Sequence, residues 1–369
     1  HMVFKGTRRR SARDIAEEIE AVGGALNADT AREQTAFYAR VLMEDAALAV
    51  DVIADILQHS VFDAEELARE RNVVLQEISQ VHDTPDDLVF DLFQEAAYPG
   101  QAIGRPVLGA PEIVAAFDRA AVLGFIDAEY GAGSMILTAA GATPHAEMVG
   151  LAERTFGDVA AKTRNGATPA RYAGGEARTE RDSEQVHLVF GLSAPSYRDA
   201  DYFAAQVAVS ALGGGMSSRL FQELREKRGL VYSVHAFASA FTDSGLFGVY
   251  AGCAEEDAEA ALDLSIQELR AARDGMTEEE TRRAAAQLRA GALMSLESTS
   301  ARCEQLAHQL HVFGRPIPTD EIIAALDAVD AAACRAALDR MIDSPTTLAA
   351  VGPLSRLPAR DAIADRLAD

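Results

Sequence analysis

The chain of 369 residues has no tryptophan, little positive charge and no long apolar run. Its 34 lysine and arginine residues face 57 aspartate and glutamate residues, which gives a net charge of −23. Such a charge argues against binding to nucleic acid or to an anionic membrane surface and favours basic partners or substrates, although solubility alone explains it equally well. No segment approaches the ~18 consecutive apolar residues of a membrane-spanning helix, so we expect no membrane span.

Cysteine is also scarce. The three cysteines, Cys253, Cys303 and Cys334, stand far apart, and each falls in a predicted strand or helix. This pattern indicates buried free thiols in a reducing compartment rather than a disulfide framework or a cysteine metal site. We therefore expect a cytoplasmic protein. A periplasmic location stays open, because the sequence enters a motif at its first residue without a leader, as if an N-terminal piece were absent.

Length and composition predict two globular domains, since 49% of the residues are apolar and 25% are charged. Residues 161–182 lack hydrophobic periodicity and carry glycine, proline and charge, which predicts a linker. The predicted domains are then residues 1–160, truncated at the start, and residues 183–369.

The first half alternates predicted helices and strands. A helix begins with a capping box at Ser11–Asp14 and ends at Gly23-Gly24. We expect the following segments after it, in order: strands at 25–30 and 35–43, helices near 44–59 and 63–81, a loop-rich region around Pro85 and 99–106, two further helices, and an apolar strand at 135–141.

The second half repeats this order at an offset of roughly 211–214 residues. The strand 245–252 and the acidic residues after it echo 35–43 and its acidic successors. Thr277–Glu280 opens a helix as Asp63–Glu66 does, and 347–352 mirrors 136–141. The sequence therefore predicts an α+β fold, a tandem duplication of two homologous domains, each a mainly antiparallel sheet with helices packed on one face.

Two carboxylates of the helix at 63–81 draw attention. Glu70 and Glu77 lie two helical turns apart, along the margin of the apolar stripe that Leu67 and Ile78 belong to. A carboxylate that faces the interior needs a cation, hydrogen-bond donors or a shifted pKa. An internal salt bridge to an arginine is the simplest explanation.

The duplication supplies an internal control for this pair. The positions that match Glu77 and Glu70 in the second half fall near Ala290-Gly291 and Arg283-Ala284, so the second copy keeps the helix but lacks both carboxylates. A purely architectural role would be needed equally in both copies. The pair in the first copy therefore indicates a functional site.

Several segments together resemble the pitrilysin and mitochondrial-processing-peptidase group of zinc peptidases, the inverzincins with an H-x-x-E-H motif. The matching segments cover nearly the whole chain: His1–Thr7 (HMVFKGT), Gly23–Ala28 (GGALNA), Arg69–Ile78 (RERNVVLQEI), Gly213–Leu220 (GGGMSSRL) and Arg225–Tyr232 (REKRGLVY). Each motif is weak alone and specific in combination.

The resemblance implies a Zn²⁺ site in which His1 is the second histidine ligand and Glu77 the carboxylate ligand, with Glu70 orienting a ligand. The family's first histidine and its general-base glutamate precede this histidine, and the given chain lacks them, so we expect it to be inactive as given. Either a segment on the order of 50 residues is missing, or His1-Met2 is a cloning remnant. The continued match through Thr7 favours a genuine His1.

The resemblance also implies roles for residues elsewhere. The hydroxyl of Tyr232 would donate to the developing oxyanion, and Arg225 would position the peptide carbonyl. Asn27, Ala28, Asp29 and Thr30 would form a strand edge to which a substrate peptide pairs. The alternatives are a surface helix leading into a strand whose tyrosine packs, and an ordinary covered edge. His308 and His311, one turn after Glu304, read more simply as partly exposed helix residues.

The function that follows is a subunit of a zinc-dependent endopeptidase of the processing-peptidase type. We expect it to cleave unfolded, basic peptides inside a closed chamber formed by a homodimer, or by a heterodimer with a related subunit. The alternative is a non-catalytic scaffold or partner subunit of the same fold, although such a subunit has no reason to retain both Glu70 and Glu77.

Overall fold

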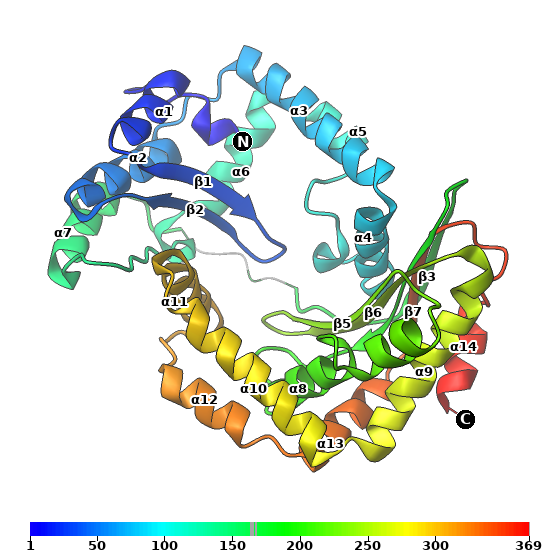
Figure 1. Ribbon diagram of the computed structural model, residues 1–369. Coiled ribbons are helices and arrows are strands. Elements are labelled where there is room, and N and C mark those ends of the chain that lie inside the picture. The colour runs from blue at the N-terminus through cyan, green and yellow to red at the C-terminus, as the bar shows by residue number, and fades with distance from the viewer. Residues whose placement is uncertain (163–165, 167, 369) are drawn as a thin grey trace. The chain divides into compact units, whose positions relative to one another are not determined.

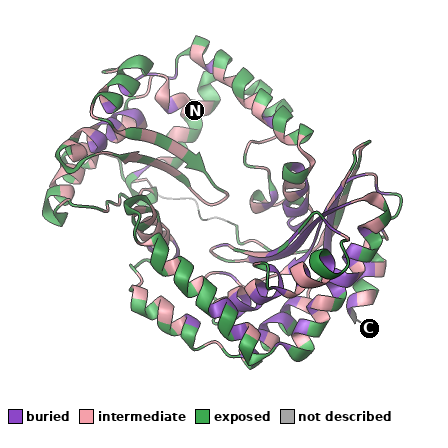
Figure 2. Ribbon diagram, in the orientation of Figure 1, coloured by how far each residue is buried: buried purple, intermediate pink, exposed green. Residues whose placement is uncertain are grey.

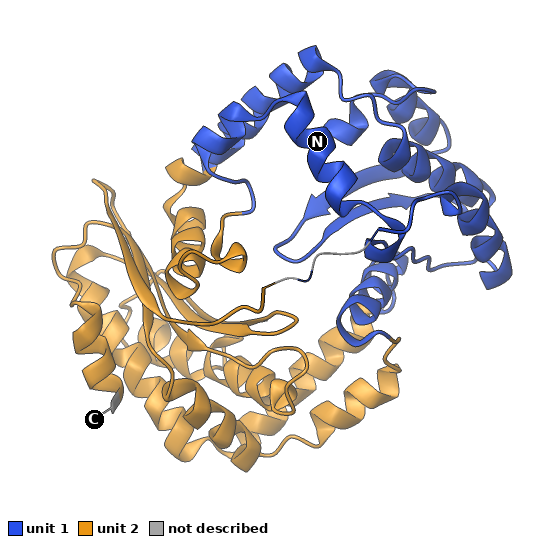
Figure 3. Ribbon diagram, turned by 180° about the vertical axis from the view of Figure 1, so that it is seen from behind, with its two compact units in different colours: residues 1–80, 107–167, 296–314 blue, residues 81–106, 168–295, 315–369 orange. Residues whose placement is uncertain are grey.

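The structure, a computed structural model, describes residues 1–162, 166 and 168–368 (Figure 1). The chain forms two compact units, each assembled from three separate segments (Figure 3). Unit 1 comprises residues 1–80, 107–167 and 296–314, and unit 2 comprises residues 81–106, 168–295 and 315–369. The fold is a tandem α+β duplication, as predicted, but the compact units are not two continuous halves of the chain.

Unit 1 holds a two-stranded antiparallel sheet. Its elements are η1 (Met2–Phe4), α1 (Ala12–Ala21), β1 (Ala25–Thr30), β2 (Thr35–Arg40), η2 (Met43–Asp45), α2 (Ala46–Gln58), α3 (Ala64–Asp83, the last residues of which belong to unit 2), α5 (Pro111–Ala116), α6 (Arg119–Glu129), η4 (Ala132–Ser134), α7 (His145–Phe156) and α11 (Thr299–Phe313).

The predicted capping box at the start of α1 is confirmed. Ser11 accepts a hydrogen bond from the backbone N–H of Asp14, and Asp14 accepts one from the backbone N–H of Ser11. After α1, Gly23 adopts a φ of +66°, which only glycine takes without strain, and turns the chain into β1. The apolar faces of α1 and α2 then bury Ile15, Ile19 and Ile56 in a small core.

Unit 2 holds a five-stranded sheet of order β3-β7-β4-β6-β5, in which only the β3–β7 pair is parallel. Its elements are α4 (Pro85–Ala97), η3 (Ala102–Gly104), β3 (Gly175–Glu180), β4 (Val186–Ser193), α8 (Tyr202–Gly213), the π-helix η5 (Phe221–Lys227), β5 (Ser233–Ala240), β6 (Gly245–Cys253), η6 (Glu255–Asp257), α9 (Ala258–Gly275), α10 (Glu278–Ser295), α12 (Thr319–Asp327), α13 (Ala331–Ile342), β7 (Thr347–Gly352) and α14 (Arg360–Ala368).

The inner strands of this sheet, β4, β6 and β7, are buried on both faces and are mostly purple in Figure 2, whereas the outer strands β3 and β5 carry exposed residues. Successive side chains of a strand point to opposite faces. In β4, Leu188 and Phe190 belong to the core shared with α8, α9 and α13, whereas Val189 packs with α4 on the other face. Gly191 permits the approach of α4, because a Cβ there would stand 2.3 Å from the ring of Phe93.

Each unit contains one helix that comes from the other half of the sequence. α4 follows α3 in the first half of the sequence, yet its Phe93 and Val89 belong to the core of unit 2. α11 stands at the matching place in the second half, yet it belongs to unit 1, where Cys303 accepts a hydrogen bond from Thr138 through its backbone oxygen. The corresponding helices of the duplication have thus changed places.

Two local predictions, for Pro85 and for the linker, were wrong. Pro85 does not lie in a loop but begins α4, because proline at the first helical position gives up a hydrogen bond that no helix makes there. Gly175–Glu180, inside the predicted linker, forms β3 beside β7, a long-range pairing with no local signal. Residues 163–165 and 167 of that linker lie outside the described residues.

Residues 135–141 do not form the predicted strand. In unit 2 the corresponding strand β7 lies between β3 and β4. Among the described residues, no counterpart of β3 or β4 lies in the two-stranded sheet of unit 1. The apolar run has no strand to pair with, and Ile136 and Leu137 stay exposed. In residues 1–162, 166 and 168–368, no helix is both long and apolar enough for a membrane crossing.

Candidate metal centre

The N-terminal arm, residues 1–8, is fastened to the turn between α2 and α3. The backbone N–H of Arg8 donates to the carbonyl of His59 at 3.1 Å, and that of Val61 donates to the carbonyl of Gly6 at 3.1 Å. The hydroxyl of Ser60 donates to the carbonyl of Val3 at 3.0 Å. These bonds fix the arm that ends in His1.

The same turn directs α3, the helix of Glu70 and Glu77. Phe62 adopts a φ of +48°, which is rare for a bulky residue, and its buried ring and backbone set the direction in which the chain leaves α2. Asp63 then caps α3 by accepting from the backbone N–H of Glu65 at 2.9 Å. One short segment therefore positions both the arm and the helix.

His1 meets both predicted carboxylates of α3. Its Nδ1 lies 3.0 Å from Oε2 of Glu70, and its Nε2 lies 3.7 Å from Oε2 of Glu77. Lys5 contacts the other oxygen of Glu70 at 2.5 Å. The three residues that the sequence assigned to the metal site thus lie together.

The burial of the two carboxylates differs from the expectation for Glu77. The side chain of Glu70 is 12% exposed, but that of Glu77 is 41% exposed, so the interpretation of Glu77 as an interior carboxylate was wrong. Only the Leu67 and Ile78 side of α3 is fully buried, and Glu77 stands at its rim. An exposed rim still suits a site that must admit a substrate.

Glu70 is held as an anion. Burial raises the pKa of its carboxyl, but hydrogen bonds from Lys5 and His1 outweigh this effect and leave the pKa below its usual value. An anionic Glu70 is a hydrogen-bond acceptor for Nδ1 of His1, and Nε2 is the ring nitrogen that lies toward Glu77.

This arrangement fits a zinc ion in part. A metal-bound histidine commonly donates its second ring N–H to a carboxylate, as His1 does to Glu70, and imidazole nitrogen and carboxylate oxygen are both zinc ligands. Among the described residues, however, no group of three or more histidine, cysteine, aspartate or glutamate side chains is arranged as a complete metal site. His1 and Glu77 would be two of the three protein ligands of a catalytic zinc.

Arg225 and Tyr232 lie in unit 2, and His1 and Glu77 lie in unit 1. Arg225 is exposed on the π-helix η5, with its guanidinium 4.9 Å from the centroid of the Phe221 ring. The Tyr232 side chain is 63% exposed, so it does not pack as a core tyrosine would. Their catalytic roles stay predictions.

β1 offers an open edge. Its residues Asn27–Thr30 pair with β2 on one side, and within the described part of the chain β1 has no strand partner on the other. The side chain of Asn27 accepts from the backbone N–H of Ala28. The predicted peptide-binding role of Asn27, Ala28, Asp29 and Thr30 stays a prediction, with a free edge where it requires one.

Sequence reasoning missed two supporting residues, Lys5 and Asp55. Lys5 lies inside the matching segment His1–Thr7, where a charged residue beside a ligand was the available signal. The only sequence signal for Asp55 was a charged residue on the apolar face of α2. Its side chain is fully buried in the structure. His59, one turn later at the end of the same helix, lies 3.2 Å from Oδ1 of Asp55, but the other partners of Asp55, Thr7, Arg9 and Arg10, lie more than forty residues away in sequence.

Comparison with known proteins identifies the family. The model of the insulinase family (peptidase family M16) matches residues 1–111, and that of the peptidase M16 inactive domain matches residues 116–288. An uncharacterized zinc protease of Rickettsia felis is 38% identical over 354 residues, covering 96% of this chain and 86% of the relative. An uncharacterized zinc protease of Streptomyces coelicolor is 38% identical over 379 residues, covering 100% and 82%.

A solved structure shares the fold. The chain from "Complex III2 from Candida albicans, Inz-5 bound" superposes with a TM-score of 0.84 over 96% of this chain and 89% of its own length, at 18% identity. The extent and identity of the sequence matches show that this chain belongs to the insulinase family, peptidase family M16. The predicted pitrilysin-like resemblance is confirmed.

Proposed function

We propose that the chain is a subunit of a zinc-dependent endopeptidase. The single observation that carries the proposal is the convergence of His1 Nε2 and Glu77 Oε2, 3.7 Å apart, while Glu70 fixes the other ring nitrogen. The naming of its relatives as zinc proteases supports Zn²⁺ as the metal.

In this proposal His1 and Glu77 hold the metal, and Glu70 keeps His1 in the correct tautomer and orientation. A bound zinc ion would polarise the scissile carbonyl and lower the pKa of a bound water. Tyr232 donates its hydroxyl proton to the developing oxyanion, and Arg225 positions the peptide carbonyl. The exposure of both side chains favours contact with a substrate over packing.

The substrate in this proposal is an unfolded peptide that adds a strand to the free edge of β1. Main-chain pairing explains why an extended peptide is preferred over a folded one. The net charge of −23 favours basic peptides. A closed chamber formed by a homodimer, or by a heterodimer with a related subunit, is part of the same proposal.

The decisive experiment removes each ligand and measures zinc in the purified protein. His1→Ala and Glu77→Gln should each weaken zinc affinity more than ~100-fold, beyond the loss typical for residues that only support a ligand. The matched control is Glu65→Gln, an 84% exposed carboxylate on the same helix, which should leave zinc binding unchanged. Stoichiometric zinc in the Glu77→Gln variant, measured by metal analysis after dialysis, would rule out the ligand assignment.

The alternative is a non-catalytic subunit of the same fold. Two observations favour it: the family model that covers residues 116–288 is described as an inactive domain, and the fold recurs in a complex III chain. Cleavage of an unfolded basic peptide separates the two. The protein tested must carry the His-x-x-Glu that precedes His1 in the family. Zinc-dependent cleavage that Tyr232→Phe slows would then favour the peptidase, and zinc binding without cleavage would favour the scaffold.

A further inference from the structure

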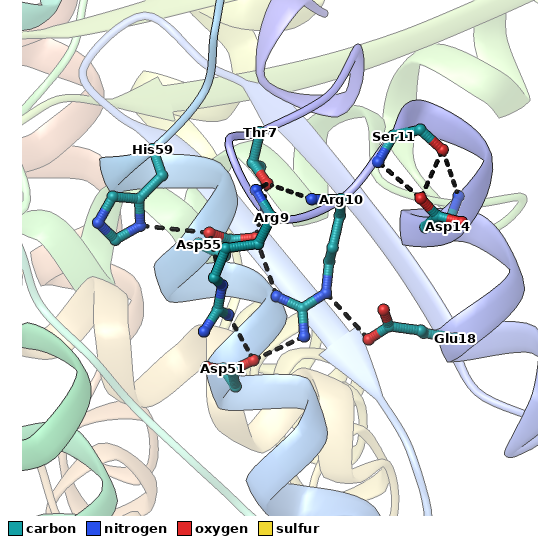
Figure 4. A network of polar contacts seen from close by, with 9 residues as sticks. All are labelled: Thr7, Arg9, Arg10, Ser11, Asp14, Glu18, Asp51, Asp55 and His59. Atoms are coloured by element: carbon teal, nitrogen blue, oxygen red, sulfur yellow. Dashed lines mark hydrogen bonds and ion pairs between the residues drawn. The ribbon is translucent and has the colours of Figure 1, made fainter.

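A buried carboxylate organises the far end of the N-terminal arm (Figure 4). Asp55 on α2 has no exposed side-chain surface. Its Oδ2 accepts from the Thr7 hydroxyl at 2.7 Å and from Nη1 of Arg10 at 2.9 Å, and its Oδ1 accepts from Nε of Arg9 at 3.1 Å. Thr7 of the arm and the two arginines that follow the arm thus converge on one carboxylate.

Neighbouring acids complete the network. Asp51, one turn earlier on α2, accepts from both Arg9 and Arg10, at 2.6 Å and 2.7 Å. Glu18 of α1 accepts from Nε of Arg10 at 2.9 Å. Because Arg10 reaches α1 and α2 at once, the segment is anchored from two sides.

Thr7 is the centre of the network on the arm's side. Its buried hydroxyl donates to Asp55 and accepts from the backbone N–H groups of Arg9 and Arg10, at 3.0 Å and 2.9 Å. The backbone between residues 7 and 10 is thereby closed into a fixed turn, in which Thr7 N–H donates to the carbonyl of Arg10 at 2.8 Å.

The network is connected to the candidate metal centre through the backbone of the arm and makes no direct contact with it. From Thr7 the arm runs back through Gly6 to His1, bonded to His59 and Val61. From Val61 the chain continues into α3, and Arg119 of α6 holds the carbonyls of Val61 and Phe62 at 3.0 Å and 2.9 Å. The relative position of His1 and Glu77 therefore depends on how firmly the arm is tied at Thr7.

We propose that Asp55 is a positioning residue for His1, which fixes the arm through Thr7, Arg9 and Arg10 so that His1 Nε2 faces Glu77. The proposal rests on the zinc function proposed above. Asp55 contacts neither His1 nor Glu77 in the described structure, so it acts through the arm.

The test compares variants by two measurements. Amide hydrogen exchange of Arg8 and Val61, in metal-free protein, reports whether the arm is docked, because both N–H groups bond between arm and turn. Zn²⁺ affinity, from competition with a chelator, reports whether the ligands are positioned. Asp55→Asn should speed the exchange of both amides at least tenfold and weaken zinc binding by roughly 10–100-fold.

Matched variants separate positioning from general stability. Asp263→Asn removes another partly buried carboxylate, bonded to Arg366 in unit 2, and should change neither measurement. Thr7→Val loses the hydroxyl, whereas Thr7→Ser retains it, so Thr7→Ser should behave like the unchanged protein and Thr7→Val like Asp55→Asn. If Asp55→Asn does not fold, the comparison of Thr7→Val with Thr7→Ser tests the positioning role instead.

The outcomes are distinct. Unchanged exchange and zinc affinity in folded Asp55→Asn, or equal behaviour of Thr7→Val and Thr7→Ser, would overturn the positioning role. If the unchanged protein binds no zinc, the proposed function fails, and the exchange measurement alone still decides whether Asp55 docks the arm.

Discussion

The two compact units are stabilised in different ways. In unit 2 a five-stranded sheet is covered on both faces, and every residue of β6 is buried. In unit 1 a two-stranded sheet has mostly exposed residues, and a network of ion pairs and hydrogen bonds ties α1, α2 and the N-terminal arm together. The unit with the smaller apolar core carries the candidate site.

The corresponding helices α3 and α10 sharpen this contrast. Each follows the same sequence of strand, short helix and long helix, and α10 keeps its shape with alanine and glycine where α3 carries Glu77. A position that is free of packing in one copy can be used for ligands in the other. The duplication thus leaves one unit to stabilise the fold and the other to hold polar groups at its surface.

The largest expected difference lies in the two apolar cores. Phe190 of β4 is fully buried in unit 2, and Phe125 of α6 is 60% exposed in unit 1. Phe190→Ala should lower the free energy of unfolding by about 3–5 kcal/mol, through lost burial and a cavity, and Phe125→Ala by less than about 0.5 kcal/mol. Urea unfolding followed by circular dichroism measures both, since the chain has no tryptophan. Equal losses of unfolding free energy in the two variants would contradict the difference between the two cores.

Two glycine-to-alanine variants should change the free energy of unfolding in opposite directions. At Gly191 a Cβ would stand 2.1 Å from the carbonyl oxygen of Phe247, so Gly191→Ala should destabilise unit 2 by about 1–3 kcal/mol. At Gly124 in α6 nothing lies within 4 Å, and Gly124→Ala should stabilise unit 1 by about 0.5–1 kcal/mol, through the higher helix propensity of alanine. Thermal unfolding of both variants checks the prediction, and a stabilising Gly191→Ala would contradict the close packing of α4.

A smaller destabilisation than that of Gly191→Ala is expected for an ion pair of unit 2. Burial raises the pKa of Glu280, but Arg219 and the cap at Thr277 lower it more, to about 2 against an ordinary 4.5. A lowered folded-state pKa contributes stability that is present above about 4.5 and lost as the pH falls toward about 2. Glu280→Gln should cost about 1–2 kcal/mol at pH 7.

The pH dependence supplies the control for that variant. The difference in unfolding free energy between Glu280→Gln and the unchanged protein should shrink as the pH is lowered from 5 to about 3, because this carboxyl then binds a proton in the unfolded chain but not in the folded one. A difference that does not change with pH would mean that Glu280 acts through its shape and not through its charge.

Local patterns predicted much of the fold. The capping box of Ser11 and Asp14, the strands β1 and β2 and the helix α3 follow from short-range signals, and the duplication predicted the order of elements in the second half. The failures were non-local. Residues 135–141 have the composition of a strand, but a strand forms only beside a partner, and β3 depends on β7 more than 160 residues away.

The candidate site was predicted through resemblance and the internal control, which identified His1, Glu70 and Glu77. The exposure of Glu77 was not predicted, because hydrophobic periodicity places a residue on a helix face but does not tell how far the neighbouring elements cover the rim. The role of Asp55 depends on arginines of another segment, which no spacing rule brings together.

The exchange of α4 and α11 has a consequence for cutting this chain in two. A fragment of residues 183–369 would lack α4 and expose Val189, Ala349 and Val351, the apolar surface that this helix covers. A fragment of residues 1–160 would lack α11 in the same way. Each half of the sequence carries a helix that covers the other half. Fragments produced separately should therefore aggregate, and fragments produced together should stay soluble because each supplies the helix that the other lacks.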